Sequence, residues 1–480
     1  MLWQLRSIDR AFQSRQTACC EELARKLAET PGIDFIALKI NHQDDLPSAI
    51  LLAKRLRRHT ATQCLVAFGR IADFYGRQLV NTTTAFDCVC VGDPELGLTA
   101  LADHIHHRES WPTLPNLILP GTERPCHTQR DYVRDLNALP DPVYDAEIYR
   151  ALRNNRKLKL FPIEESRGCD QSCNHCPKSS EEGGLRLRSA QRVAIHMRRV
   201  TAAHGVAAFH LAGGGAAPAA YAAEVAQAFH ESGIPTVYSR EGSLRTDEIA
   251  SLPLLKNSGC VSITYGVGSG SQRLLRDYYN LDTGVTRIEN LLRGCREAGL
   301  VTVARFMYPT PADDHHTGAE TLRLLERTRP DAGLIEMPEV LPRTAWYQQP
   351  WRFGFGMSFG AQLDKLLRSR SRFGAPPGRW SVLPYRIGAM TSTQVLQSHD
   401  SMIHEVELLG VTAYMLHETP LVAHVLGWRN TLMEFRNEMI RRFLAGDVHG
   451  IARMVHDFNE CASVDASLAQ SANLRAAVGN

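Results

Sequence analysis

Short apolar runs alternate with helix-periodic runs in two separate stretches of the chain. In the first stretch, residues 35–40, 64–68 and 87–91 are apolar runs of strand length, and the segments between them place an apolar residue every three to four positions. This alternation predicts a small parallel sheet with helices on its faces. Ahead of the sheet, residues 17–29 have the pattern of an amphipathic helix, which a Pro-Gly pair ends.

The same alternation resumes near residue 157 and lasts to about residue 347. Six further apolar runs of strand length occur there, at residues 157–163, 206–213, 235–240, 260–267, 300–308 and 332–341. Six strand–helix units fit a partial (β/α)6 TIM-like barrel, in which the chemistry is expected in the loops that follow the strands.

The remaining stretches complete an α/β protein of four consecutive parts. Residues 1–110 are expected to form an N-terminal Rossmann-like parallel sheet, and the proline-rich residues 111–157 a linker. Residues 158–350 are expected to form the partial barrel. The pattern then changes, which predicts a helical C-terminal region over residues 351–480.

Composition and charge exclude several classes of protein. Hydrophobic residues make up 44% of the 480 residues and charged residues 22%, which is typical of a soluble globular chain. The net charge is only +3, so no nucleic-acid partner is indicated. The first 16 residues include Arg6, Asp9, Arg10 and Arg15, and no uncharged apolar run approaches the ~18 residues of a membrane span. We therefore expect a cytoplasmic protein without a membrane partner.

A tight group of cysteines follows the first strand of the predicted barrel. The stretch "ESRGCDQSCNHCPKS" places Cys169, Cys173 and Cys176 at x3 and x2 spacing. Twelve cysteines in the whole chain are too sparse for a disulfide scaffold, so a cluster this close is expected to bind metal. Three thiolates can hold three irons of a 4Fe-4S cluster and leave the fourth iron open. The alternatives are unrelated thiols, or a zinc site in which His175 is the fourth ligand, although its adjacency to Cys176 would strain the chelate.

The cysteine stretch resembles the signature loop of radical S-adenosylmethionine (SAM) enzymes. Residues 258–275, 298–314 and 341–348 are similar to segments of the members of this family that carry a cobalamin-binding domain. The connector "LNALPDPVYDAEIY" also resembles the linker between their cobalamin-binding domain and their barrel. Residues 1–110 would then be a cobalamin-binding-like Rossmann domain, truncated at its start because only a helix precedes residue 30.

This resemblance implies a function. Enzymes of this family use a 4Fe-4S cluster to cleave SAM to a 5′-deoxyadenosyl radical, and the protein supplies geometry and excludes water. The domain pair predicts a cobalamin-dependent C-methyltransferase in natural-product or peptide tailoring. Its partners would be a small-molecule or peptide substrate and an electron donor such as flavodoxin or ferredoxin. The cofactors would be the cluster, SAM and cobalamin.

The resemblance also implies cofactor contacts, at positions where the chain departs from the family. His175 stands where the family has an aromatic residue near the adenine of SAM. Gly213, Gly214 and Gly215 lie in "AGGGAAP", where the family has Gly-Gly-Glu-Pro and holds the amino group of SAM. A strand end that turns into a helix needs the same glycines, so a purely structural role stays open.

Two serines complete the expected set of cofactor contacts. Ser239 follows the third strand, where the family places polar contacts to SAM. Ser269 follows Gly268, where the family often has Glu-Ser, so one polar contact is missing. No catalytic residue is assigned. Two other functions stay open: a cobalamin-independent radical SAM epimerase, cyclase or rearrangement enzyme, and a degenerate non-catalytic partner of such an enzyme.

A further pattern is misleading. Residues 313–318, "DDHHTG", satisfy the Asp-x-His-x-x-Gly pattern that supplies an axial histidine in other cobalamin proteins. The pattern lies in the fifth loop of the predicted barrel and not after a strand of the N-terminal sheet. His315 and His316 are therefore expected to be solvated loop residues, and cobalamin would bind without a histidine from this pattern.

Overall fold

The structure is a computed structural model. It describes residues 2–42, 45–59, 63–121, 130–149, 152–153, 157–178, 183–213, 217–244, 248–357, 383, 385–428 and 430–464. The chain forms two compact units. Unit 1 comprises Met1–Arg134, Ser180–Gly183 and Val340–Gln397, and unit 2 comprises Asp135–Ser179, Gly184–Glu339 and Ser398–Asn480. The four domain boundaries drawn from the sequence stay predictions.

Unit 1 is built around a small sheet with helices on both faces. Its elements are α1 (Leu2–Glu29), β1 (Phe35–Lys39), α2 (Asp45–His59), β2 (Cys64–Phe68), α3 (Arg70–Thr83), β3 (Cys88–Cys90), α4 (Pro94–Asp103), η1 (Arg108–Thr113), β4 (Leu117–Ile118), α11 (Ala345–Gln348), η6 (Pro350–Phe353), β13 (Phe355–Met357) and β14 (Tyr385–Ile387). The main sheet has the order β1-β2-β3-β4, in which the first three strands are parallel and β4 is antiparallel.

Both faces of this sheet are buried, which explains why its strands are continuous apolar runs. Leu65 and Ala67 of β2 face a core that α2 and α3 complete. Cys64 and Val66 point to the opposite face and pack in a second core with Trp111 of η1. The structural cysteines of the sheet are therefore small buried side chains.

Residues 111–157, which the sequence predicts to be a linker, contain ordered structure. The 3-10 helix η1 ends there, β4 adds a fourth strand to the sheet, and η2 (Leu136–Ala138) follows. A strand of only two residues produces no measurable alternation of apolar and polar positions, and proline-rich sequence masks it further.

Unit 2 contains the predicted barrel and most of the C-terminal helices. Its further elements are β5 (Phe161–Glu164), β6 (Ser166–Arg167), β7 (Arg186–Leu187), α6 (Ala190–His204), β8 (Ala208–Ala212), α7 (Ala219–Glu231), β9 (Val237–Glu241), η4 (Ile249–Ser251), α8 (Leu252–Asn257), β10 (Cys260–Gly268), η5 (Leu274–Tyr278), α9 (Val285–Glu297), β11 (Val301–Met307), α10 (His315–Thr328), β12 (Ala332–Glu336), α14 (Thr419–Val425), α15 (Leu432–Leu444) and α16 (Val448–Cys461). Helix α13 (Ser392–Leu408) begins in unit 1 and continues in unit 2.

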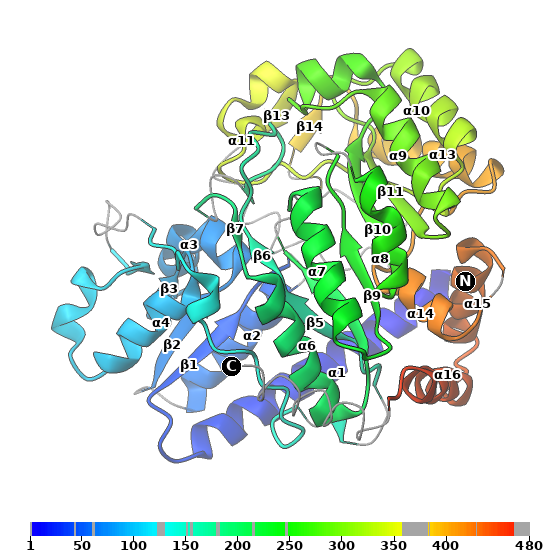
Figure 1. Ribbon diagram of the computed structural model, residues 1–480. Helices are drawn as coiled ribbons and strands as arrows, with labels where there is room; N and C mark the ends of the chain where they lie inside the picture. Colours follow the sequence, from blue (N-terminus) through cyan, green and yellow to red (C-terminus); the bar gives the residue numbers. More distant parts are fainter. Residues whose placement is uncertain are drawn as a thin grey trace. The chain divides into compact units, whose positions relative to one another are not determined.

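The six predicted barrel strands form one parallel sheet. Its order, β12-β11-β10-β9-β8-β5, follows the chain order without interruption, as in an open (β/α) barrel. Helices α6, α7 and α8 cover its outer face in Figure 1. The predicted α/β fold class, with a Rossmann-like sheet, a partial barrel and a helical C-terminal region, is confirmed.

The inner face of this sheet is closed at one end by C-terminal helices. Val303 of β11 and Ala332 of β12 pack in one buried cluster with Ala423 of α14 and with Leu432 and Phe435 of α15. Because side chains alternate along a strand, the residues two and four positions further on the same strands face the same side, nearer the carboxyl ends.

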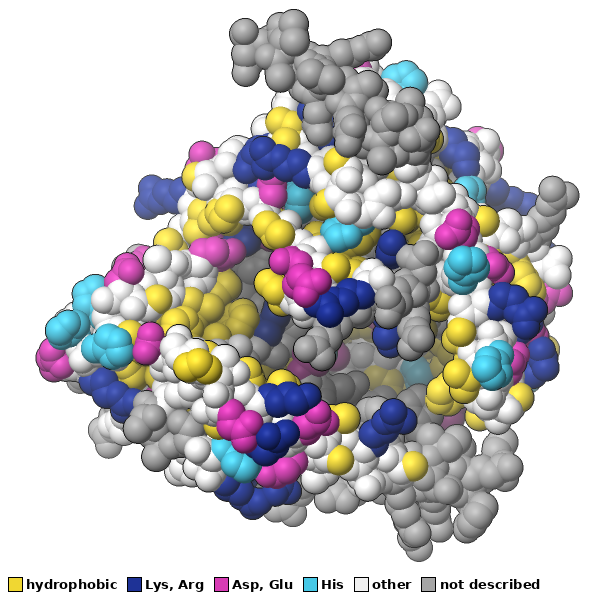
Figure 2. Space-filling view, turned by 90° about the horizontal axis from the view of Figure 1, so that it is seen from below, with side chains coloured by type: hydrophobic (Ala, Val, Ile, Leu, Met, Phe, Trp, Pro, Cys, Tyr) yellow, Lys and Arg dark blue, Asp and Glu magenta, His cyan; other side chains and the backbone are white. Residues whose placement is uncertain are grey.

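The surface carries charges of both signs. Lysine and arginine side chains lie among aspartates and glutamates on the face shown in Figure 2, in agreement with the small net charge. Within the described residues, none of the helices combines the length and the apolar character that crossing a membrane requires.

Candidate active site

The three clustered cysteines lie on a loop whose base is a short antiparallel ladder. Strand β6 pairs with β7, with Ser166 opposite Leu187 and Arg167 opposite Arg186. Between these strands the chain turns at Gly168, whose φ of 75° suits a residue without a side chain. Cys169 is buried, and Cys173 and Cys176 are half-buried.

Hydrogen bonds tie the loop to the end of η5 and the residues that follow it. The backbone N–H of Asn174 donates to the carbonyl of Tyr279 at 3.0 Å, and its side chain donates to the carbonyl of Tyr278 at 3.0 Å. In return, the Asn280 side chain donates to the carbonyl of Ser172 at 2.8 Å. Two segments more than 100 residues apart in sequence thus fix each other.

A buried charge network supports the residue just before β6. Arg240 of β9 lies 3.6 Å from a carboxylate oxygen of Glu165 and 3.4 Å from one of Glu248. The Tyr265 hydroxyl donates to the other Glu248 oxygen at 2.8 Å. All three charged residues are buried. A buried arginine between two carboxylates is held in one position, because breaking either pair would leave an uncompensated charge.

The chemistry of the loop thiols bears on what the loop can bind. Burial raises the pKa of the Cys169 thiol, and nearby Cys176 raises it further. Thiols held close together in this way lose their protons on metal binding, since the thiolate is the ligand. Among the described residues, no three His, Cys, Asp or Glu side chains, the three loop cysteines included, are arranged to hold one metal ion. Three thiol donors on one loop fit the donor set of an iron–sulfur cluster.

His175 lies in the same loop as a neutral, half-buried ring. It meets Tyr279 edge to face, with ring centroids 5.3 Å apart. Burial lowers the pKa of His175 to about 4. A neutral imidazole that is packed against an aromatic ring can also contact another ring, and the predicted contact of His175 with adenine stays a prediction.

Gly213 has a packing reason to be glycine. A side-chain carbon there would lie 2.3 Å from the Ser166 hydroxyl, so the end of β8 can approach β6 only without one. Its carbonyl accepts a hydrogen bond from the Lys178 ammonium at 3.3 Å. The next two predicted contacts, Gly214 and Gly215, lie outside the described residues.

Polar side chains gather on the inner face of the barrel sheet toward its carboxyl ends. We call this group the polar layer, and its members are Lys178, His210, Ser239, Glu241, Arg305, Glu336 and His417. Arg305 of β11 makes two parallel hydrogen bonds to Glu336 of β12, at 2.8 and 3.0 Å. The Lys178 ammonium lies 3.6 Å from a Glu241 carboxylate oxygen.

Strand alternation places these residues on the inner face. On β8, Phe209 and Leu211 belong to the core under the helices, so His210 points the other way. On β9, Tyr238 packs edge to face on Phe229 of α7 at 5.1 Å, so Ser239 points inward.

Space remains beside these side chains. A side-chain carbon built at Gly266 of β10 would meet none of the described atoms within 4 Å. Gly266 pairs with Arg305 in the strand register. The polar layer therefore borders open space at the position where a barrel of this kind carries its chemistry.

Two histidines and a serine form a chain of hydrogen bonds in the polar layer. Nδ1 of His210 lies 3.0 Å from the Ser239 hydroxyl, and its Nε2 lies 3.0 Å from Nε2 of His417. One of the two facing nitrogens must carry the proton and the other accept it. Burial, and then the neighbouring His417, lower the pKa of His210 to about 4, so this ring is neutral at pH 7.

Glu241 is an anion within this layer. Burial by itself raises the pKa of its carboxyl group, but Lys178, Arg305 and the two histidines together lower it more, so the net pKa is below its ordinary value. Together with the Arg305–Glu336 pair, the layer therefore presents two acidic and two basic side chains close together.

His417 reaches the polar layer through a segment that crosses the inner face. Residues 411–417, the crossing segment, begin beside β12, where Gly333 donates to the carbonyl of Thr412 at 2.9 Å and Ile335 to that of Ala413 at 3.0 Å. They end beside β8, at the contact with His210. The exposed edge of β12 is thereby paired, and a C-terminal histidine is brought to a barrel strand.

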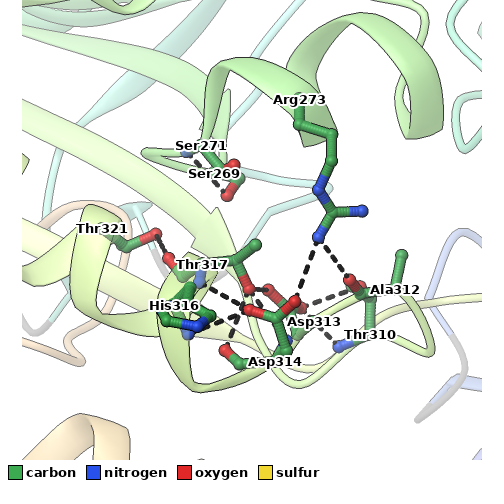
Figure 3. A network of polar contacts seen from close by, with 10 residues as sticks. All are labelled: Ser269, Ser271, Arg273, Thr310, Ala312, Asp313, Asp314, His316, Thr317 and Thr321. Atoms are coloured by element: carbon green, nitrogen blue, oxygen red, sulfur yellow. Dashed lines mark hydrogen bonds and ion pairs between the residues drawn. The ribbon is translucent and has the colours of Figure 1, made fainter.

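Of the two predicted serine contacts, Ser239 lies within β9 and not after it, while Ser269 does follow its strand and makes a local hydrogen bond. It is buried, and its hydroxyl accepts from the N–H of Ser271 at 3.1 Å (Figure 3). The preceding Gly268 has a φ of 80°. A glutamate at that position would be strained, which explains the departure from the family pattern in backbone terms.

The "DDHHTG" stretch forms the N-terminus of helix α10. Asp314 caps α10 by accepting from the N–H groups of His316 and Thr317, both at 2.9 Å, and the Thr317 hydroxyl accepts from the N–H of Asp314 at 2.9 Å (Figure 3). His315 and His316 are exposed on the first turn of the helix. The solvated character is as expected, but they are helical residues and not loop residues.

Sequence reasoning missed most of the polar layer. His210 is the single polar residue of "VAAFHLAG" and Arg305 the single charged residue of "LVTVARFMY". Such a residue inside a buried, otherwise apolar strand was a usable signal. His417 carries no such signal, because only the fold brings the crossing segment to β8.

Comparison with known proteins agrees with this geometry. Residues 163–325 match the model of the radical SAM superfamily. The chain contains a radical SAM domain. This domain includes the three cysteines and four of the five barrel-strand residues of the polar layer. The resemblance seen in the sequence is confirmed.

One curated relative matches part of the chain. Cytidylyl-2-hydroxyethylphosphonate methyltransferase of Streptomyces wedmorensis is 28% identical over 155 residues, which are 32% of this chain and 29% of the relative. The match thus spans less than a third of that protein.

Solved structures match nearly the whole chain in fold. The radical SAM methyltransferase TsrM from Kitasatospora setae, with tryptophan substrate and a SAM analogue bound, has a TM-score of 0.64 at 15% identity, over 90% of this chain and 91% of TsrM. The cobalamin-dependent radical SAM enzyme OxsB has a TM-score of 0.54 at 15% identity, over 96% of this chain and 69% of OxsB. At these identities the likeness shows the fold.

Proposed function

We propose that the protein is a radical SAM enzyme that uses cobalamin to methylate an unactivated carbon in natural-product or peptide tailoring. The observation that carries the proposal is the loop with Cys169, Cys173 and Cys176, in a radical SAM domain and next to an open polar layer. The chemical class of the substrate, a small molecule or a peptide, is part of the proposal.

The three cysteines are the proposed ligands of a 4Fe-4S cluster. When bound, such a cluster with one open iron supplies the electron that cleaves SAM. The chain contributes a loop fixed by Asn174 and Asn280, which restricts the positions that the thiols can take before the cluster binds.

The charges of the polar layer suit the amino-acid end of SAM. That end carries an ammonium and a carboxylate, and Glu241 offers the former a partner while Lys178 and Arg305 offer the latter one. We keep His175, the glycines from Gly213 to Gly215, Ser239 and Ser269 as proposed contacts.

The cobalamin part of the proposal concerns unit 1. A TsrM structure contains cobalamin and a 4Fe-4S cluster, and an OxsB structure contains aqua-cobalamin and SAM. Support in this chain is the parallel order of β1 to β3, because ligands of open α/β sheets bind at the carboxyl ends of parallel strands.

The experiment is anaerobic reconstitution of the full chain with iron and sulfide, followed by EPR of the reduced protein with and without SAM. We expect a 4Fe-4S signal that shifts when SAM is added and that is absent in Cys173→Ala. A zinc-bound protein, or a cluster that does not respond to SAM, would overturn the radical SAM assignment. Absorbance after incubation with hydroxocobalamin and desalting tests the cobalamin part independently.

Two alternatives remain distinguishable. An epimerase, cyclase or rearrangement enzyme would bind the cluster and SAM but no cobalamin, and its product would not gain the ~14 Da of a CH2 group. A non-catalytic partner would fail to cleave SAM. The altered "AGGGAAP" loop and Gly268 are the departures from the family pattern that motivate this alternative.

The chemistry of the proposed reaction also indicates its electron donor and its location in the cell. Reduction of the cluster needs an external electron donor, for which we propose flavodoxin or ferredoxin. We propose a cytoplasmic location, because free thiols and an oxygen-sensitive cluster are stable in a reducing compartment.

A further inference from the structure

Asp141 lies in the proline-rich connector and forms ion pairs with three arginines. Its carboxylate is 2.8 Å from Nη2 of Arg188, 3.5 Å from Nη2 of Arg192 and 2.6 Å from Nη1 of Arg199. The Asp141 side chain is only 7% exposed. A nearly buried carboxylate with three cationic partners indicates a built contact and not a chance surface pair.

Arg188 is the most deeply buried of the three partners. Its side chain is 2% exposed, and its Nε has no hydrogen-bond partner among the described residues. Arg192 and Arg199 are 24% and 59% exposed, so water can solvate them if Asp141 is removed. The guanidinium of Arg188 would instead stay buried without the carboxylate that balances it.

The position of Arg188 connects this contact to the cysteines. Arg188 directly follows β7, the return strand of the cysteine loop, and its N–H donates to the carbonyl of Glu165 at 2.9 Å. Glu165 directly precedes β6, the outgoing strand of the same loop. The hydrogen bond of Arg188 therefore joins the two strands at the base of the loop, and the ion pair with Asp141 keeps the Arg188 side chain in position.

The connector also holds the start of the helix after the loop. The Asn137 side chain accepts from the N–H of Ser189 at 2.8 Å, and Arg192 of α6 donates to the carbonyl of Leu139 at 3.3 Å. Ser189 is itself the N-cap of α6. These contacts set where the loop ends and α6 begins.

We propose that Asp141 is a positioning residue for the iron–sulfur cluster: through its ion pair with Arg188 it keeps the base of the cysteine loop closed and so holds the three thiols in place. This inference rests on the proposed function for its cluster. Burial alone would raise the pKa of Asp141, but the hydrogen bond from Arg188 and the neighbouring cations lower it, so Asp141 is charged at neutral pH.

The test compares Asp141→Asn with Asp145→Asn in the reconstituted full chain. Asp145 lies in the same connector, is exposed, and caps a local turn by accepting from the N–H of Glu147 at 2.7 Å. We expect Asp141→Asn to lose its cluster to a chelator about tenfold faster than wild type, which corresponds to about 1.4 kcal/mol. We also expect its EPR signal to respond to SAM with a smaller or broader shift, while Asp145→Asn behaves as wild type.

A second variant separates positioning from the cost of an unpaired charge. Asp141→Asn with Arg188→Met removes both partners and leaves no buried cation, so it should recover much of the thermal stability that Asp141→Asn loses. If positioning is the role of the pair, the double variant still releases the cluster faster than wild type. Wild-type release rate and EPR response in the double variant would overturn the proposal.

A measurement without any cluster keeps the two hypotheses apart. Hydrogen–deuterium exchange of peptides that cover residues 165–188 should be faster in Asp141→Asn than in wild type, even without iron. Failure of wild type to take up a cluster would reject the proposed function alone. Unchanged exchange in these peptides would reject the positioning role, whether or not a cluster is bound.

Discussion

The two halves of the inner face of the barrel sheet have opposite character. Toward the start of the strands, Val303 and Ala332 are buried against Phe435 and its neighbours on the C-terminal helices. Two positions further along β11, Arg305 faces Glu336 beside open space. The same strands are therefore closely packed at one end and carry the polar layer at the other.

This difference shows how one sheet can hold an open charged site. A charged layer without packing costs free energy, because polar groups lose water without gaining full compensation. The apolar half and the C-terminal helices offset that cost on the same strands, within a few residues. Changes in one half should thus affect stability, and changes in the other should affect cofactor binding.

The largest effect is expected at the cysteine loop. Cys173→Ala should abolish SAM cleavage, because two thiolates cannot hold the cluster with one open iron. Iron content, EPR and 5′-deoxyadenosine release measure this. Cys461→Ala, which removes an exposed cysteine of α16, is the matched control and should retain all three signals.

Substitutions in the apolar half should lower the free energy of unfolding. Phe435→Ala removes a buried ring from the cluster with Val303, and we expect a loss of about 3 to 5 kcal/mol in the free energy of unfolding. Urea denaturation of the apoprotein measures it. Phe443→Ala, at an exposed site on the same helix, should cost little. Equal losses in both variants would mean that the ring does not close the inner face.

Substitutions in the polar half should change the affinity for SAM. Arg305→Gln removes the cation next to Gly266, so we expect SAM to bind about 10- to 100-fold more weakly. Titration of the EPR shift with SAM measures the affinity. Arg327→Gln, on the outer helix α10, is the control. An unchanged affinity would remove Arg305 from the proposed SAM contacts.

A smaller effect concerns pH. The pKa of His210 is about 4 in the folded chain and about 6.5 when unfolded, so the unfolded chain takes up this proton first as the pH falls. Wild type should lose up to about 3 kcal/mol between pH 6.5 and pH 4 from this group. Ser239, Glu241 and His417 face the ring. Denaturation measurements at several pH values should show that the free energy of unfolding of His210→Gln falls less steeply with falling pH than that of wild type.

The smallest effect tests the misleading histidine pattern. His315→Ala should leave cobalamin absorbance and affinity unchanged, because the residue is exposed on the first turn of α10. A change in the spectrum of bound cobalamin would mean that the pattern is functional after all.

The sequence predicts the strands well and the polar layer poorly, for physical reasons. Buried parallel strands are apolar throughout, so all six barrel strands are visible as runs, and the cysteines are visible because one loop carries them. The two-residue strands β4, β6 and β7 are too short to produce a pattern. The contact between His210 and His417 joins residues 207 positions apart, and only tertiary folding creates it.

The C-terminal helices have a consequence for synthesis. Phe435 leaves the ribosome about 100 residues after the last barrel strand, which takes roughly 5 to 20 s at ordinary rates of translation. During that interval the nascent sheet exposes Val303, Ala332 and Leu334 to water. A newly made chain is thus most vulnerable to aggregation while its barrel strands are already complete, and chaperones would act at that stage.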